Sequence, residues 1–362
     1  MSTFRPGFVL EQTLGHVTHG QNLRRFIGRE AGVEPSWYDV PFQPEGTLYR
    51  VPPLSTNWSL RGSLYARRAL QADGWRELDA LFVHTLTIAL FATPFYDRIP
   101  TVLSLDATPI NFDSVGRLYG HEAHPGAVER VKRNVVRRAV SRADAFVSWS
   151  EWAKRSLVDD YGADPDRVLV AAPGADLDLF PAGIRREGDG PVRILFVGGD
   201  FVRKGGDTLL QAYRDRLQGR AELHFVTAHQ MPNEEGVFIH NGVKPNSLEL
   251  LELFNTADIF ALPTRGDCLA VVLGEAMAAS LPIITTAVGA HAEAVEQDRS
   301  GLLVPPDNLE ALGDTLETLV NDRALRQAMG ARGREIAEER FDAKRNALAV
   351  LDLMRDVAGR SR

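Results

Sequence analysis

The sequence predicts an α/β protein built from two doubly wound, parallel-sheet domains. Three observations lead to this prediction. Short apolar runs alternate with longer amphipathic segments along the chain, which is the pattern of repeated strand–helix units. The chain has 362 residues, enough for two domains of about 150–180 residues each. A stretch rich in glycine, proline and charge, PAGIRREGDGP, interrupts the pattern near the middle of the chain and has the composition of a linker.

Apolar runs of four or five residues in the first half are predicted strands: Gly7–Leu10, Ala80–His84, Thr101–Leu105, Ala145–Ser148 and Val168–Ala171. Charged segments with helical periodicity lie between them, at Gly126–Val140 and Ser150–Asp160. The strands predicted in the second half are Arg193–Val197, Glu222–Thr227, Val237–His240, Ile259–Ala261, Ile283–Thr285 and Gly301–Val304. The helices predicted there are Leu248–Phe254, Gly274–Ala279, Leu309–Asn321, Ala324–Glu338 and a last one from Phe341.

Composition restricts the class of protein. A hydrophobic share of 44% with 25% charged residues is that of a globular protein, and a net charge of −7 argues against a nucleic-acid partner. A single cysteine, Cys268, forms no internal disulfide, which favours a reducing compartment. We find no leader pattern at the N-terminus and no run of the roughly 18–20 apolar residues that a membrane span needs. We therefore expect a cytoplasmic protein that touches a membrane, if at all, at its inner face.

The most informative segment is PTRGDCLAVVLGEAMAA, residues 263–279. A strand runs into a loop and then into a helix that starts near Leu269–Val271, and the free amides at such a helix start suit a pyrophosphate. Asp267 lies in the loop, and Glu275 interrupts an otherwise apolar helix. A carboxylate buried there is costly unless it is paired or binds a ligand. A charge near a helix start, paired with a neighbouring side chain, explains the spacing equally well.

A second segment, RILFVGGDFVRKGGD, covers residues 193–207. An apolar strand leads into Gly198 and Gly199, and the cations Arg203 and Lys204 follow. Glycines let the backbone approach a ligand closely, and cations suit phosphate oxygens. The spacing fits neither a P-loop nor a G-x-G-x-x-G fingerprint. On its own, the segment is explained more simply as a solvated turn with a basic pair.

Taken together and in order, these segments resemble glycosyltransferase family four, a family of retaining enzymes with the two-domain GT-B fold. The shared motifs are Lys204-Gly205, the acidic pair Asp267 and Glu275, the run Leu281–Thr286, Val288-Gly289 with Glu293, Ser300–Val304 and Glu339–Phe341. The stretch from Ser148 to Phe180 also matches. The resemblance covers residues 140–345 well and residues 1–140 loosely.

The resemblance implies two Rossmann-like domains that face each other across a cleft. Residues 1–180 would form the acceptor-side domain, 181–191 the linker and 192–340 the domain that binds the nucleotide sugar. Residues 341–362 would form the family's crossover helix and pack back on the first domain.

The resemblance also implies roles for individual residues. In the family, the second acidic residue binds the donor ribose and the first contacts the transferred sugar, which implies these roles for Glu275 and Asp267. The amides of Ala270 and Val271 would hold the distal phosphate, and Lys204 would neutralise the pyrophosphate. The implied donor-binding set is Gly20, Gly198, Gly199, Arg203, Lys204, Asp267, Cys268, Leu269, Ala270, Val271 and Glu275.

Three positions depart from the family pattern. Gly199 stands where the family has an arginine, and Arg203 is the nearest replacement. The first acid is an aspartate, Asp267. Leu105 replaces the family's histidine at the end of the fourth strand, so the next residue, Asp106, either serves the acceptor cleft or caps a turn before Pro109.

The stretch GHVTHGQN, residues 15–22, is expected to be a loop that faces the donor phosphate and the acceptor, as in the family. His19 and Gly20 are its candidates, with weaker support for His16, and His84 at the end of its strand would point toward the same cleft. A solvated loop histidine is the simpler alternative. The predicted catalytic set is Asp267, Lys204, Arg203, His19 and Asp106.

No metal is expected, because two cations and a helix dipole can stabilise a leaving diphosphate. We interpret the strings Asp164–Asp166 and Asp176–Asp178 as turns, and YGHEAH, with His121, Glu122 and His124, as a loop rather than a metal site. The basic side chains on the predicted helix 126–140 either face solvent or meet an anionic lipid or acceptor: Arg130, Lys132, Arg133, Arg137 and Arg138.

The predicted function is therefore the retaining transfer of a sugar, expected to be a hexose, from a UDP- or GDP-linked donor, without metal or cofactor. The hydroxyl acceptor is unidentified: a glycan, a lipid-linked glycan or a small molecule. The alternative is a non-catalytic nucleotide-sugar-binding protein acting as a subunit or regulator, which the missing histidine favours and the intact Lys204, Asp267 and Glu275 oppose. A glycogen-type phosphorylase would need a pyridoxal lysine, for which we find no motif. The sequence specifies neither the linkage nor the oligomeric state.

Overall fold

The computed structural model describes residues 3–360 except 14, 73, 117–125 and 181–189. The chain divides into two compact units. Unit 1 comprises Met1–Asn111, Ala123–Pro173 and Ala343–Arg362, and unit 2 comprises Phe112–Glu122 and Gly174–Asp342.

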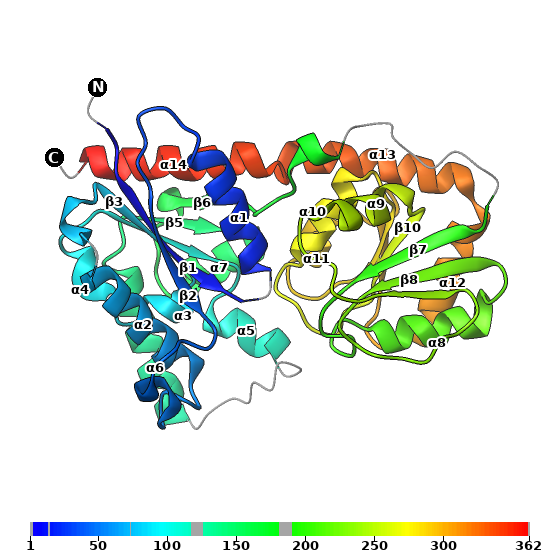
Figure 1. The fold of residues 1–362 in the computed structure, drawn as a ribbon, viewed down its shortest axis with the longest axis horizontal. Helices are drawn as coiled ribbons and strands as arrows, with labels where there is room; N and C mark the ends of the chain where they lie inside the picture. The colour runs from blue at the N-terminus through cyan, green and yellow to red at the C-terminus, as the bar shows by residue number, and fades with distance from the viewer. Residues whose placement is uncertain (1–2, 14, 73, 117–125, 181–189, 361–362) are drawn as a thin grey trace. The chain divides into compact units, whose positions relative to one another are not determined.

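The described part of unit 1 contains a six-stranded parallel sheet in the order β2-β1-β3-β4-β5-β6 (Figure 1). Its strands are β1 (Pro6–Gln12), β2 (Ser36–Pro41), β3 (Ala80–His84), β4 (Thr101–Leu105), β5 (Ala145–Ser148) and β6 (Val168–Val170). The strand order reverses between β1 and β3. In doubly wound sheets, ligands bind outside the carboxyl ends of the strands at such a reversal.

Helices cover both faces of this sheet: α1 (His16–Ile27), α2 (Trp58–Ala72), α3 (Leu86–Ala89), α4 (Thr93–Tyr96), α6 (Gly126–Val140), α7 (Glu151–Asp159) and α14 (Ala343–Arg360). The short helix α5 (Pro109–Val115) follows β4 and is divided between the units at Asn111. Successive residues of a strand point to opposite faces. Phe8 of β1 therefore joins the core beneath α1 and α14, whereas Val9 joins the core on the opposite face. The C-terminal helix α14 lies against α1, β3 and β4, so the last residues of the chain belong to unit 1.

The described part of unit 2 repeats this architecture, with the strand order β12-β11-β10-β7-β8-β9. Its strands are β7 (Val192–Val197), β8 (Ala221–Val226), β9 (Val237–His240), β10 (Ile259–Leu262), β11 (Ile283–Thr286) and β12 (Gly301–Val304). Its helices are α8 (Gly206–Arg216), α9 (Leu248–Thr256), α10 (Val271–Ala278), α11 (His291–Ala294), α12 (Leu309–Asn321) and α13 (Arg323–Arg340). Here the order reverses between β7 and β10.

The predicted fold class is confirmed, because each unit is a parallel sheet flanked by helices. Several elements were not predicted, among them the edge strand β2 and the helix α2. In α2 the buried positions are occupied mostly by small or polar residues, among them Gly62, Ser63 and Ala66, so the helix lacks a strong apolar stripe. Residues 15–22 were expected to form a loop. This expectation is wrong, because the chain is helical from His16 onward, in α1. None of the described helices combines the length and hydropathy of a membrane span.

Candidate functional site

Two loops of unit 2 meet at the carboxyl ends of β7 and β10. Gly205 adopts a φ of 77° at the end of the first loop, and a Cβ atom there would lie 2.1 Å from the carbonyl oxygen of Pro263. The backbone N–H of Arg265 donates to the carbonyl of Arg203 over 2.9 Å. The glycine therefore brings the β7 and β10 loops into direct contact at the reversal of the strand order.

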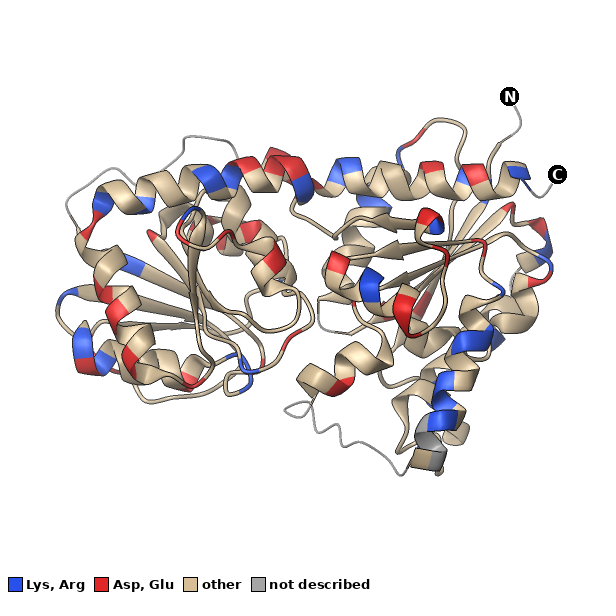
Figure 2. Cartoon of the chain, turned by 180° about the vertical axis from the view of Figure 1, so that it is seen from behind, with Lys and Arg blue, Asp and Glu red and all other residues tan. Residues whose placement is uncertain are grey.

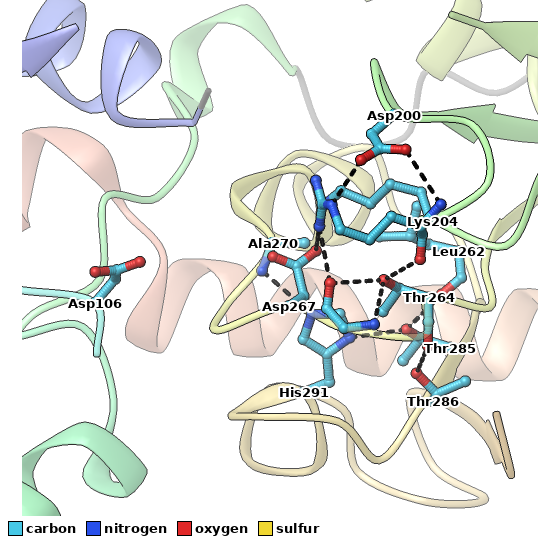
Figure 3. Close-up of polar contacts among 12 residues, drawn as sticks. Asp106, Asp200, Lys204, Leu262, Thr264, Asp267, Ala270, Thr285, Thr286 and His291 are labelled. Carbon is cyan, nitrogen blue, oxygen red and sulfur yellow. Dashed lines mark hydrogen bonds and ion pairs between the residues drawn. The ribbon is translucent and has the colours of Figure 1, made fainter. Parts of the chain in front are cut away.

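Both predicted cations of this site lie close to Asp267 (Figure 3). Lys204 forms a hydrogen-bonded ion pair with the Asp267 carboxylate. Arg203 is buried, with its Nη1 donating to the carbonyl of Gly266 over 2.8 Å and lying 4.0 Å from Asp267 Oδ2. Its Nε donates to Asp200 over 3.0 Å. Burial acts to raise the pKa of Asp267, but the charges of Lys204 and Arg203 outweigh burial and the pKa is lowered, so the carboxylate is ionised.

Glu275 lies on α10, eight residues after Asp267, and its surroundings are different. The residue is only 7% exposed, and no described residue donates a hydrogen bond to its carboxyl group. Burial raises its pKa from 4.5 to about 7. A buried carboxyl group without protein partners has unused hydrogen-bonding capacity and is suited to receive a ligand.

The loop between β11 and α11 supports the same site. Gly289 has a φ of 57°, and a Cβ atom there would lie 2.2 Å from the carbonyl oxygen of Asp267. The amide of Ala290 donates to the carbonyl of Cys268 over 2.8 Å. The amide of Ala270, expected to be free for a phosphate, instead donates to Nε2 of His291 over 3.2 Å (Figure 3). His291 is a residue of the site that we did not predict.

The candidate residues of unit 1 lie at the carboxyl ends of β1, β3 and β4. Nδ1 of His16 lies 2.8 Å from Nε2 of His84, and Nδ1 of His84 lies 3.0 Å from Oγ of Ser104. Nε2 of His16 lies 4.0 Å from Oδ2 of Asp106. Burial lowers the pKa of His84 well below its usual range and raises that of Asp106. The unit thus presents an imidazole and a carboxyl group side by side, backed by a second imidazole.

His19 and Gly20 occupy interior positions of α1. The His19 ring lies against Phe82, His84 and Trp149, is 4% exposed, and burial lowers its pKa to about 3. A Cβ atom on Gly20 would lie 3.4 Å from the Leu10 side chain. Both residues pack between α1 and the sheet of unit 1, and of the two histidines in this stretch it is His16 that lies near Asp106.

The other candidates from the sequence are the two Asp-x-Asp strings, the YGHEAH segment and the basic residues of α6. Asp164 and Asp176 each accept a hydrogen bond from the amide two residues later and cap a short turn. His121, Glu122 and His124 lie outside the described residues. Among the residues that are described, no three His, Cys, Asp or Glu side chains are grouped as metal ligands would be. The basic residues of α6 gather along that helix (Figure 2), with Arg130, Arg133, Arg137 and Arg138 exposed.

Comparison with known proteins decides the family. Residues 191–322 match the model described as Glycosyl transferases group 1, and residues 21–179 match Glycosyltransferase Family 4. A D-inositol 3-phosphate glycosyltransferase of Xylanimonas cellulosilytica is 31% identical over 96% of this chain and 90% of the relative. The chain belongs to glycosyltransferase family 4. It is accordingly a glycosyltransferase, as the resemblance predicted.

Solved structures of other proteins share the fold of this chain. Sucrose-phosphate synthase from Thermosynechococcus elongatus superposes with a TM-score of 0.76 at 17% identity, over 98% of this chain and 99% of that one. Anabaena HepE, solved in complex with UDP-glucose, superposes with a TM-score of 0.66 at 14% identity, over 96% and 99% of the two chains. At these identities the likeness establishes the GT-B fold alone.

The structure brings Arg203, Lys204 and Asp267 of this family 4 chain together, as the sequence motifs suggested. It also reveals two contacts that the motifs did not suggest, His291 on the Ala270 amide and His16 on His84. The only signal in the sequence was that His291 stands in the Val288–Glu293 motif. A motif does not show where its side chains point.

Proposed function

We propose that this family 4 enzyme transfers a sugar from a nucleoside-diphosphate sugar to a hydroxyl group with retention of anomeric configuration. The observation that carries the proposal is the buried Glu275 carboxyl group, which has no hydrogen bond from a described residue. An ionised carboxylate accepts hydrogen bonds from two hydroxyls at once, which matches a ribose diol. Asp267, held by Lys204, precedes it on the same loop and helix and would contact the transferred sugar.

The diphosphate would be stabilised without a divalent ion. Lys204 and Arg203 supply two positive charges beside the start of α10, and the helix dipole adds to them. In the reaction, the bond from the anomeric carbon to the phosphate oxygen breaks while the acceptor oxygen bonds on the same face. The proton of the acceptor hydroxyl passes to the departing phosphate oxygen. No enzymic base is required.

The acceptor would bind to unit 1 at His16 and Asp106. Nε2 of His16 and Oδ2 of Asp106 are 4.0 Å apart, a separation that lets one hydroxyl group contact both atoms at ordinary hydrogen-bond lengths of about 2.8 Å. The similarity to the D-inositol 3-phosphate glycosyltransferase of Xylanimonas cellulosilytica makes D-inositol 3-phosphate the first acceptor to test. Exposed arginines on α6 would favour an anionic acceptor or an anionic membrane surface near it. The single buried cysteine fits our proposal that the enzyme works in the cytoplasm.

The test uses the full chain with UDP-glucose, then GDP-glucose, in excess EDTA, with and without D-inositol 3-phosphate. We expect release of nucleoside diphosphate and a product whose anomeric proton coupling equals that of the donor. His16→Asn should reduce transfer while leaving UDP affinity unchanged. His240→Asn is the matched control, because His240 forms a similar histidine pair, 3.1 Å from His224, on the β8–β9 side of unit 2.

Three outcomes would count against the proposal. Binding of nucleotide without release of diphosphate, even to water over hours, would indicate the non-catalytic alternative. Activity that stops with EDTA and returns with magnesium would show that a metal takes part. A product of inverted configuration would exclude the same-face reaction.

A further inference from the structure

The first turn of α10 has no capping side chain of its own. Its N-cap residue, Ala270, carries a methyl group, and the preceding residues Cys268 and Leu269 are buried. A helix start leaves backbone amides without intrahelical partners, and they need an acceptor. The acceptor here comes from elsewhere in unit 2: Nε2 of His291, which receives the Ala270 N–H over 3.2 Å.

The hydrogen bonds around His291 determine its tautomer. The hydroxyl of Thr285 donates its single hydrogen to the carbonyl of Leu262 over 2.8 Å. Thr285 Oγ1 must therefore accept the hydrogen bond that joins it to Nδ1 of His291, 3.0 Å away. An amide N–H can only donate, so Nε2 must carry a lone pair toward Ala270. Both ends of the ring thus require neutral imidazole with its proton on Nδ1.

A continuous chain of three hydrogen bonds results, from the Ala270 amide through His291 and Thr285 to the Leu262 carbonyl at the end of β10 (Figure 3). His291 and Thr285 are fully buried, so water cannot replace either partner. Burial also lowers the pKa of His291 to about 4, which keeps the ring neutral. This chain of hydrogen bonds therefore fixes the first turn of α10 relative to the ends of β10 and β11.

We propose that His291 is a positioning residue of the donor site, which fixes the start of α10 so that the amides of Val271 and Val272 meet the donor phosphate. This inference rests on the proposed function, because it assumes a diphosphate at this helix start. The Ala270 amide is already bonded to His291, so it is not one of the phosphate donors. Among the described residues, neither the Val271 nor the Val272 amide donates to a carbonyl oxygen.

The test compares a nucleotide with its nucleoside, because only the nucleotide reaches the amides. UDP and uridine, and in parallel GDP and guanosine, are titrated against the full chain and its variants. In His291→Leu, the Ala270 N–H loses its acceptor, and UDP affinity is expected to fall about tenfold or more. Uridine affinity should stay within about twofold, since Glu275 is untouched. His291→Gln, which keeps one acceptor and one donor, should restore most of the UDP affinity.

A second variant and a spectrum keep the inference testable if His291→Leu does not fold. Thr285→Val removes the hydroxyl group that sets the tautomer of His291 and should lower UDP affinity, as His291→Leu does. Thr285→Ser keeps the hydroxyl group and should not lower UDP affinity. Nitrogen-15 spectra of histidine-labelled protein should show His291 protonated at Nδ1. Equal losses for UDP and uridine, unchanged UDP affinity in His291→Leu, or a proton on Nε2 would each overturn the inference. If the wild-type chain binds neither UDP nor GDP, it is the proposed function that fails.

Discussion

Glu275 has a pKa of about 7 in the free protein, so its charge at neutral pH depends on what lies against it. A ligand that donates hydrogen bonds to the carboxylate stabilises the ionised form and lowers this pKa. A raised pKa also affects folding. The stability that this group contributes is fully present below its ordinary value of 4.5 and is lost as pH rises through about 7. Above neutral pH, the buried Glu275 carboxylate therefore lowers the folding stability of the protein unless a ligand occupies the site.

The first prediction follows from this linkage. UDP binding should release protons near neutral pH, and UDP affinity should increase as pH rises through about 7, because the ribose requires the ionised carboxylate. Calorimetry in two buffers of different ionisation enthalpy measures the released protons. Glu275→Gln should lower affinity by about 1.5–3 kcal/mol, the range for a hydrogen bond to a charged group. The phosphate titrates in both proteins, so equal proton release in Glu275→Gln would contradict the ribose assignment.

The sequence predicted several residues of the candidate site, but not the contacts between residues that are far apart in the chain. Lys204, Asp267 and Glu275 are recognisable because each combines a charged side chain with glycines or apolar residues in a short segment. The contact of His291 with Ala270 spans 21 residues, and that of His16 with His84 spans 68. Such contacts depend on how loops pack after folding, and the local sequence does not encode them. The expectation that His19 and Gly20 lie in a loop was wrong, because the stretch is helical.

The loops at the reversal of strand order act as one element in unit 2. Gly205 and Gly289 both have positive φ, and each lies so close to a carbonyl oxygen of the β10 loop that a side chain does not fit. The segment around Gly205 was predicted to carry phosphate chemistry, whereas Gly289 was recognised only as part of a motif shared with family 4. The structure adds a steric reason for glycine at both positions. By contrast, β2 and α2 escaped prediction because they carry no motif and only a weak apolar pattern.

The second prediction separates close packing from backbone strain. Gly205→Ala should lower the melting temperature and weaken UDP binding, because a Cβ atom 2.1 Å from the Pro263 carbonyl oxygen pushes the two loops apart. Gly219→Ala is the matched control. Gly219 has nearly the same φ, 76° against 77°, but no atom lies within 4 Å of its added Cβ. It should show only the backbone cost of about 1 kcal/mol and normal UDP affinity. Equal effects of the two variants would show that the loop contact does not matter.

At the scale of the whole molecule, the two units are not simply the two halves of the chain. Unit 1 is completed by α14, although all of unit 2 precedes this helix in the sequence. The apolar stripe of α14 predicts a helix that packs on a core, but the core of either unit would serve equally well. Only the resemblance to family 4 pointed to the first domain. The bridge between Ala175 and Asp342, with a 2.8 Å hydrogen bond from the Ala175 amide to the Phe341 carbonyl, joins the segments beside two of the points at which the chain passes from one unit to the other.

The last prediction concerns removal of this helix by ending the chain at Asp342. The deletion takes seven buried apolar side chains from the core of unit 1: Ala343, Ala347, Val350, Leu351, Met354, Val357 and Ala358. A fully buried large apolar side chain contributes about 1.5–3 kcal/mol, so the loss is comparable with the entire stability of a domain, about 5–15 kcal/mol. Unit 1 should therefore unfold or melt far earlier by calorimetry, and transfer should be lost. Unit 2 should still bind UDP, because Lys204, Asp267, Glu275 and His291 all lie within it.

In the full chain, Leu351→Ala should cost about 2–5 kcal/mol of stability, whereas Asp352→Ala, at the exposed neighbouring position, should cost almost nothing. A truncated protein that transfers sugar at the normal rate would show that α14 is dispensable, and loss of UDP binding would show that unit 2 depends on unit 1 to fold.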